Sequence, residues 1–213
     1  MGKTSFRTTY RVFRRRFRNK LVPLATASLL TLIAIGYASG MNKPVPIVDP
    51  ASYAAVLHLI GRVESNDNYN AYFGNAGNSE ITFTDMTIAQ VMQWQRDFVA
   101  QGHASSAVGR YQIIDSTLAG LVSRHVVDAD QKFDEATQDK LAIALLERRG
   151  SVAYVKKELT PQEFAANIAK EWAALPRVIG GDPNASYYAG DGLNAARTNV
   201  DEVMKAIKPI SIQ

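Results

Sequence analysis

The 213-residue sequence contains no cysteine and only three histidines, His58, His103 and His125. Without cysteine, no disulfide can hold or regulate the fold, and both thiolate catalysis and cysteine-bound zinc are excluded. The histidines are too widely spaced for a metal-binding motif such as H-E-x-x-H. We therefore expect a function that needs neither a metal ion nor another cofactor.

Acidic residues are missing from residues 1–20, which contain eight of the 24 lysines and arginines. The rest of the chain has 16 basic and 20 acidic residues, so the net charge of +4 belongs to this N-terminal tail. The body of the chain is mildly acidic and lacks the basic patch that nucleic-acid binding requires. We therefore expect no nucleic-acid partner.

Charged residues are also absent from residues 21–39, LVPLATASLLTLIAIGYAS. A helix of this length would extend about 28 Å, close to the thickness of the hydrocarbon core of a bilayer. Because the preceding tail is basic, the positive-inside rule places the N-terminus in the cytoplasm and the C-terminal domain across the membrane. The segment could be a permanent anchor, a signal peptide cleaved near Gly36-Tyr37-Ala38, or a transient anchor that later leaves the membrane. We expect a single-pass membrane anchor.

Composition divides the chain into four regions. Residues 1–20 are expected to form a basic cytoplasmic tail and residues 21–39 a transmembrane signal anchor. Residues 40–51 are expected to form a proline-rich linker and residues 52–213 a globular domain.

Apolar periodicity and capping residues predict a mainly α domain with at most a small β element. The strongest start signal is the capping box Thr160-Pro161-Gln162-Glu163. We expect Ser52 to cap the first helix and either Asp85 or Thr87 to cap the second. The expected helices span 52–63, 88–102, 115–125, 134–149, 164–175 and 200–207, and a short strand is expected at 80–84.

Glu64 is expected at the C-terminal end of the first helix. Apolar residues recur at helical spacing from Tyr53 to Val63, and the polar, Asn-rich stretch after Ser65 cannot continue a helix. The partial negative charge of the helix end and half-burial should both raise the pKa of Glu64. A carboxylic acid that keeps its proton near neutral pH is what a general acid requires. The alternative is a solvated glutamate at the end of a surface helix.

Two further segments carry residue types suited to sugar binding. One is Gly109-Arg110-Tyr111-Gln112, and the other runs from Lys170 to Pro176 and is followed by Tyr187-Tyr188. Glycine allows close approach of the backbone, an aromatic ring stacks on the apolar face of a sugar, and an amide binds hydroxyl and N-acetyl groups. The alternative is that Tyr111 and Gln112 only pack and satisfy backbone groups.

Together these segments resemble the lysozyme superfamily, specifically the lambda-type phage endolysins, over roughly residues 53–208. Glu64 and Asp67 match an E-x-x-D-like turn, Phe83-Thr84-Asp85 an F-T-D element, Gly109 to Gln112 the G-R-Y-Q motif, and Trp172 to Pro176 a W-A-x-L-P segment. Glu64-Ser65 with Gly109-x-x-Gln112 also looks like the E-S and G-x-x-Q motifs of bacterial lytic transglycosylases. The membrane segment and the longer stretch before G-R-Y-Q depart from the lambda-type pattern.

The resemblance implies an α+β lysozyme-like fold and cleavage of the β-1,4 bond between N-acetylmuramic acid and N-acetylglucosamine in peptidoglycan. Glu64 would be the catalytic acid and base of a lytic transglycosylase, which forms a 1,6-anhydro product without water. In a hydrolytic lysozyme, the alternative, Asp67 or Asp85 would be the second carboxylate. We expect Asp85 to cap a helix and leave open whether Asp67 braces its turn. The substrate-binding residues that the resemblance implies are Ser65, Asp67, Arg110, Tyr111, Gln112 and Tyr188.

The favoured hypothesis is a peptidoglycan lytic transglycosylase that opens the wall locally. It would be anchored in the bacterial inner membrane or an internal membrane of a virion, with its catalytic domain in the periplasm. It would act in a virion or in wall remodelling, with membrane proteins of the virion or of a secretion system as partners. One alternative is a signal-arrest-release endolysin, whose anchor leaves the membrane at lysis. Another is a non-catalytic glycan-binding or assembly protein of the membrane, but pure binding has no need of a half-buried acid such as Glu64.

Overall fold

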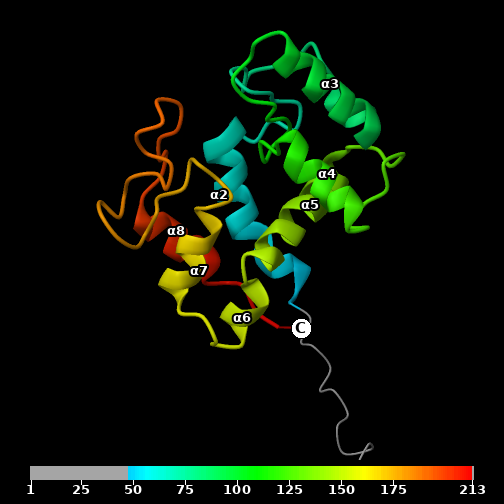
Figure 1. The fold of residues 1–213 in the computed structure, drawn as a ribbon. Coiled ribbons are helices and arrows are strands. Elements are labelled where there is room, and N and C mark those ends of the chain that lie inside the picture. Colours follow the sequence, from blue (N-terminus) through cyan, green and yellow to red (C-terminus); the bar gives the residue numbers. More distant parts are fainter. Residues whose placement is uncertain (1–47, 213) are drawn as a thin grey trace, which may run out of the picture. The chain divides into compact units, whose positions relative to one another are not determined.

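The computed structural model describes residues 48–212 (Figure 1). The predicted tail, membrane anchor and most of the predicted linker lie outside the described residues. Among the helices of the described part, none combines the length and the apolar composition needed to cross a membrane.

The described chain is mainly helical, as predicted. Its pairing of extended backbone is limited to isolated bridges, so the β contribution is smaller than an α+β fold implies. In chain order, the elements are η1 (Pro50–Tyr53), α2 (Ala54–Ser65), η2 (Phe83–Asp85), α3 (Ile88–Ala100), α4 (Asp115–Ser123), α5 (Glu135–Arg148), α6 (Ser151–Val155), α7 (Pro161–Ile168) and α8 (Val200–Ile207).

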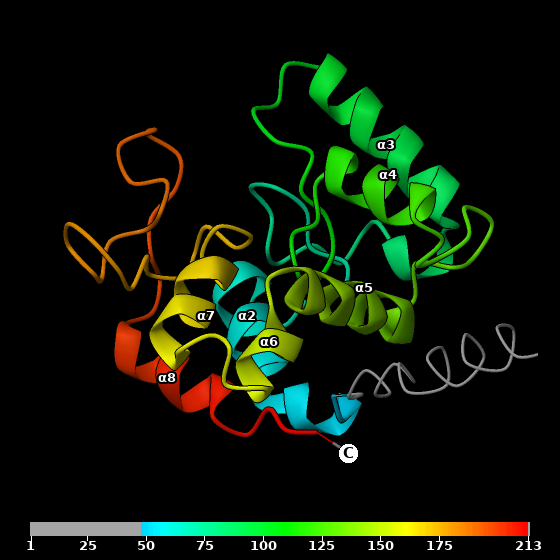
Figure 2. The same cartoon turned by 60° about the horizontal axis from the view of Figure 1, so that its bottom comes forward.

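Helix α2 lies between the other helices and carries the predicted apolar stripe. Val56, Ile60 and Val63 are buried, and α2 contacts η1, α5 and α8. Both views show α2 with α7 and α8 on one side and α5 on the other (Figures 1 and 2). Because burial of apolar side chains is the main stabilising contribution, α2 is held firmly on these sides, and its C-terminal end has a fixed position.

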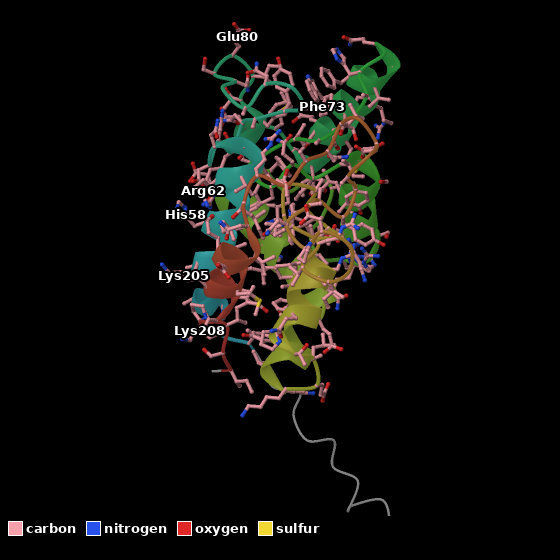
Figure 3. The ribbon with its side chains drawn as sticks, turned by 90° about the vertical axis from the view of Figure 1, so that its left-hand side faces the viewer. His58, Arg62, Phe73, Glu80, Lys205 and Lys208 are labelled. Carbon is pink, nitrogen blue, oxygen red and sulfur yellow. The ribbon has the colours of Figure 1, made fainter. Side chains whose placement is uncertain are left out.

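The outer face of α2 and α8 carries exposed charges of both signs, including Asp201 and Glu202 of α8. His58 and Arg62 of α2 lie along it with Lys205 and Lys208 (Figure 3). Arg62 Nη2 lies 2.6 Å from Glu202 Oε2 of α8, and both side chains are about half exposed. This ion pair lies on the surface, so it adds little to the stability that the buried face provides.

Helices α3 and α4 pack against each other away from α7 and α8 (Figures 1 and 2). An aromatic cluster joins α3 to the long loop that precedes it. Phe83 packs edge-on against Trp94, with ring centroids 4.7 Å apart, and Trp94 stacks on Phe98 at 4.6 Å. Such pairs contribute stability beyond their buried area and fix the loop against the helix.

Two predicted caps are wrong. Ser52 lies inside η1, and Asp49 caps that turn by accepting a hydrogen bond from the Ala51 N–H at 3.0 Å. Asp85 is exposed in η2, whereas Thr87 caps α3 in a complete capping box with Gln90. In both cases the predicted side chain is of the right type but lies two or three residues from the residue whose backbone geometry suits the cap.

Three other predictions fail at the level of elements. The expected strand at 80–84 is instead occupied in part by η2, and the short helix α6 was not predicted. The capping box at Thr160 does start α7 with both reciprocal hydrogen bonds, but α7 ends at Ile168 rather than at Leu175. The residues after α7 turn back toward α2, because Ala174 donates a hydrogen bond to Glu64.

Candidate active site

Glu64 lies in the last turn of α2, as predicted. The helix ends because Asn66 and Asp67 adopt left-handed backbone conformations, with φ of 56° and 62°. The Glu64 side chain is partly buried, and its Oε1 accepts a hydrogen bond from the Ala174 N–H at 3.1 Å. A residue 110 positions away thus fixes the orientation of this carboxyl group.

Burial raises the pKa of Glu64 above its ordinary value. The Ala174 N–H and the positive charge of Arg197 act in the opposite direction, because both favour the carboxylate, but burial is the larger effect. The predicted direction of the pKa shift is therefore confirmed. The arrangement provides a carboxylic acid that retains its proton to a higher pH than an exposed glutamate, next to a donor that can stabilise the carboxylate once the proton has left.

Arg110 connects the turn after Glu64 to the G-R-Y-Q segment. Its Nε and Nη2 donate to Asp67 Oδ1 at 3.0 and 2.7 Å. Its Nη1 donates to the hydroxyls of Tyr69 and Tyr111 at 2.9 and 3.0 Å, and both hydroxyls donate to Asp139 Oδ1. We call these five residues the Arg110 network. Burial and the hydrogen bond to Asp139 raise the pKa of Tyr111, so its hydroxyl stays a donor.

Ser65 is buried, and its hydroxyl forms hydrogen bonds to backbone carbonyls of the protein. Its hydroxyl lies 3.0 Å from the Gly61 carbonyl and 2.8 Å from the Arg110 carbonyl, and it donates to these oxygens. Gly61 faces the same contact, since a Cβ there would collide with Arg110 Nε and lie 2.6 Å from Asp67 Oδ1. The absence of a side chain at Gly61 lets Arg110 lie directly against α2.

Gly109 is required by its conformation and by its surroundings. Its φ is 77°, and a Cβ there would collide with Gln138 Oε1. Gln138 is fully buried in α5 and accepts from the Arg110 N–H at 2.9 Å while donating to the Tyr69 and Phe133 carbonyls. This amide holds the G-R-Y-Q segment on α5, and only glycine allows the backbone to approach it.

A cavity of about 260 Å³ lies beside this segment. Tyr111, Gln112 and Tyr188 line it, together with Trp172 and charged residues that include Lys170. Gln112 is partly exposed and Tyr188 is exposed, whereas only a small part of Tyr111 reaches the cavity. The Tyr188 hydroxyl donates to the Lys170 carbonyl at 2.8 Å, which fixes its ring at the rim.

The segment from Lys170 to Ala174 connects this cavity to Glu64. Trp172 lines the cavity and donates from Nε1 to the Tyr111 carbonyl at 3.2 Å, while Ala174, two residues later, binds Glu64. Residues 172–175 form a turn, closed by a hydrogen bond from the Leu175 N–H to the Trp172 carbonyl at 3.1 Å. The cavity wall and the hydrogen-bond partner of Glu64 therefore belong to the same short turn, although Glu64 itself does not line the cavity.

Comparison with known protein families decides the identity. The family model described as Endolysin matches residues 54–190, more than half of the chain, from the first residue of α2 to just past Tyr188. The chain belongs to the endolysin family. It is a lysozyme-type, phage endolysin-like protein, and it is an enzyme that cleaves the peptidoglycan of the cell wall. Comparisons with curated proteins and with solved structures gave no match.

In this endolysin, the predicted site residues fall into two groups. Gln112 and Tyr188 reach the cavity and are placed to contact a ligand. The second group bonds within the protein: Ser65 donates to the Arg110 carbonyl, and Arg110 donates to Asp67. Tyr111 also belongs to this group, because it is mostly buried and its hydroxyl is part of the Arg110 network. The roles of all six in substrate binding stay predictions, and those of the second group are better described as holding Glu64 and the cavity wall in register.

Several contributors to the site were missed. The Ala174 N–H is a backbone group and has no signature in the sequence. Gln138 and Asp139 lie on a helix whose start was predicted, but only the fold brings them to the G-R-Y-Q segment. Arg148 of the cavity wall looks like an ordinary surface charge in the sequence, whereas Glu171 lies in the segment from Lys170 to Pro176 but was given no role of its own.

Proposed function

We propose that this endolysin is a lytic transglycosylase with Glu64 as its only catalytic carboxyl group. Glu64 donates its proton to the glycosidic oxygen between N-acetylmuramic acid and N-acetylglucosamine as that bond breaks. The 6-hydroxyl of the muramic acid then forms a bond to its own anomeric carbon. Its proton goes to the Glu64 carboxylate, which restores the acid and consumes no water.

The single observation that carries this proposal is the environment of Glu64. Burial raises its pKa, so the proton is available for the leaving oxygen. The Ala174 N–H needs a lone pair on Oε1, which leaves Oε2 to hold the proton. After proton transfer, the same N–H stabilises the carboxylate that must act as base.

The second carboxylate of a hydrolytic mechanism has weaker support. Asp67 is the candidate closest in sequence, but two hydrogen bonds from Arg110 hold its Oδ1, and His58 Nδ1 lies 3.4 Å from its Oδ2. A carboxylate held in this way is poorly suited to activate water or attack a sugar. Asp85 is exposed in η2, on the other side of the Asn-rich loop.

The products of peptidoglycan digestion test this proposal. We expect the purified chain to release muropeptides that end in 1,6-anhydromuramic acid and are lighter by one water than those from a hydrolytic muramidase digest of the same peptidoglycan. Mass spectrometry distinguishes the two sets. Muropeptides with ordinary reducing ends would show a hydrolase and redirect attention to Asp67 and Asp85.

We also propose that residues 21–39 anchor the enzyme in a membrane, with residues 1–20 in the cytoplasm and the catalytic domain in the periplasm or the corresponding side of a virion membrane. The uncharged stretch behind a basic tail supports this. Tethering confines cleavage to the wall near the membrane, which suits local penetration in a virion or beside secretion-system membrane proteins.

The anchor proposal predicts the behaviour of Leu30→Arg. A charge at the centre of a spanning helix costs roughly 3 kcal/mol of insertion free energy, so most of this variant should leave the carbonate-washed membrane fraction. Leu30→Ile, which keeps the apolar character, should stay in it. If the wild-type chain were found in the soluble fraction to the same extent as Leu30→Arg, the result would contradict a permanent anchor.

A further inference from the structure

The cavity beside Gln112 has a charged wall that the proposed bond cleavage does not use. Four of its lining residues are charged: Arg148 and Arg149 at the end of α5, and Lys170 and Glu171 after α7. Their side chains come from two segments that the fold brings together, so the cluster is a property of the cavity.

Most of this charge is organised around Glu171. Its side chain is 7% exposed and receives both Nη2 hydrogen bonds of Arg148, at 2.8 and 2.7 Å. Arg149 Nε also donates to it at 2.8 Å. One carboxylate thus faces two guanidinium groups, and the pair of arginines keeps a positive excess although Glu171 is neutralised.

Lys170 adds a further positive charge at the rim, beyond the excess of the two arginines over Glu171. Its Nζ lies 3.3 Å from the Asn167 amide oxygen and 5.9 Å from the centre of the Tyr187 ring, both neutral partners. Within residues 48–212 no carboxylate pairs with it. The cavity wall therefore carries three cations and one carboxylate, next to the neutral side chains of Gln112 and Tyr188.

We propose that this cavity binds a carboxylate of the stem peptide attached to the muramic acid, with Lys170 and Arg148 as its ligands. The inference rests on the proposed function and adds the peptide to the substrate that the enzyme recognises. The glycan of peptidoglycan is largely uncharged, and its anionic groups are mainly the carboxylates of the stem peptides. Trp172 of the cavity wall and Ala174, which binds Glu64, lie in one turn of the chain, and this places the cations beside the sugar that carries the stem peptide.

The experiment compares two substrates that differ only in the peptide. Glycan strands are prepared with their stem peptides, or after removal of the peptides by an amidase and conversion of the lactyl carboxylates so exposed to amides, and kcat/KM is measured on both. For Lys170→Gln we expect a loss of about tenfold on peptide-bearing strands and less than twofold on stripped strands, the loss expected from removing one charge-assisted hydrogen bond. Lys205→Gln, on the outer face of α8 (Figure 3), removes the same charge and should change neither value.

Arg148→Gln serves as a second variant and should show the same selective loss, since Arg149 still neutralises Glu171. An equal loss on both substrates, or no loss on either in folded Lys170→Gln and Arg148→Gln, would overturn the inference.

A binding measurement separates this failure from failure of the proposed function. With Glu64→Gln to prevent turnover, calorimetry compares a disaccharide-tetrapeptide with the same compound after amidation of its carboxylates. We expect amidation, or Lys170→Gln in the same background, to weaken binding about tenfold. If the wild-type chain cleaves neither strand but this difference is found, the transglycosylase proposal falls and the carboxylate site stands. Binding that ignores amidation overturns the site.

Discussion

Replacing Glu64 with glutamine should reduce the rate of peptidoglycan cleavage about 1000-fold, the range that general acid–base catalysis contributes. Glutamine keeps the shape of the side chain, and its amide oxygen can still accept the hydrogen bond from Ala174. It cannot donate the proton that the leaving oxygen needs. Release of dye from labelled peptidoglycan measures the effect, and binding to insoluble peptidoglycan should be retained.

The pH dependence of the stability of Glu64→Gln provides a control, because the direction of its change relative to wild type follows from the pKa of Glu64. Burial raises the pKa of Glu64 in the folded state, so the folded state favours the protonated form. The stability contributed by that proton is complete below the unfolded-state pKa near 4.5 and is lost as the pH rises through the folded-state pKa. Glu64→Gln has no such loss.

The melting temperature of Glu64→Gln relative to wild type should therefore increase between pH 4 and pH 8. A difference that is constant with pH would contradict the proposed environment of Glu64. A large drop in melting temperature at both pH values would mean that the loss of activity reports unfolding, and retained activity in a folded variant would exclude Glu64 as the acid.

Arg110→Met should be the most destabilising single change near the site, lowering the free energy of unfolding by about 3 kcal/mol. The variant keeps the apolar stem but removes the guanidinium group, leaving Asp67 and two tyrosine hydroxyls without their donor. Only 14% of the Arg110 side chain is exposed, so water compensates these groups poorly. Urea denaturation followed by circular dichroism measures the change.

Arg62→Met is the matched control for this prediction. Its ion pair with Glu202 is as short, at 2.6 Å, but both partners are 47% exposed. Exposed pairs contribute at most about 1 kcal/mol, so this variant should lose far less stability than Arg110→Met. Equal losses in the two variants would show that the Arg110 network is no more important than a surface ion pair.

Loss of Arg110 should also lower activity, through Glu64. The guanidinium group fixes Asp67 in the turn that ends α2, and it holds in place the backbone of residue 110, whose carbonyl accepts a hydrogen bond from Ser65. A catalytic acid that moves by about 1 Å loses much of its rate advantage. The contribution of Arg110 to catalysis is thus one of positioning.

The parts of the fold that depend on local signals could be predicted from the sequence. Neighbouring residues determine three of these features, and all three were predicted: the apolar stripe of α2, the capping box of α7 and the bounds of α8. The C-terminal end of α7 could not be predicted, because the residues after Ile168 keep a helical composition. They leave the helix to bring Trp172 and Ala174 to the site, a tertiary effect that overrides local preference.

The residues of the site also divide into those that local sequence could predict and those that depend on distant parts of the chain. Glu64 could be located because its features, a helix end and partial burial, follow from a short stretch of chain. The partners that define its chemistry are far away: Ala174 is 110 residues from it, and Arg110 is 43 residues from Asp67. Motif matching identified Arg110 and Tyr111 as important, but only the structure shows that they point into a network rather than toward solvent.

The most direct test of the account is digestion of purified peptidoglycan by the wild-type chain in oxygen-18 water, followed by mass spectrometry of the muropeptides. If Glu64 acts alone, the 6-hydroxyl of the muramic acid closes the ring, and the anhydro products carry no heavy oxygen. A hydrolytic muramidase run in parallel must incorporate one heavy oxygen at each new reducing end. The same incorporation by this endolysin would contradict the proposed mechanism and require a second carboxylate.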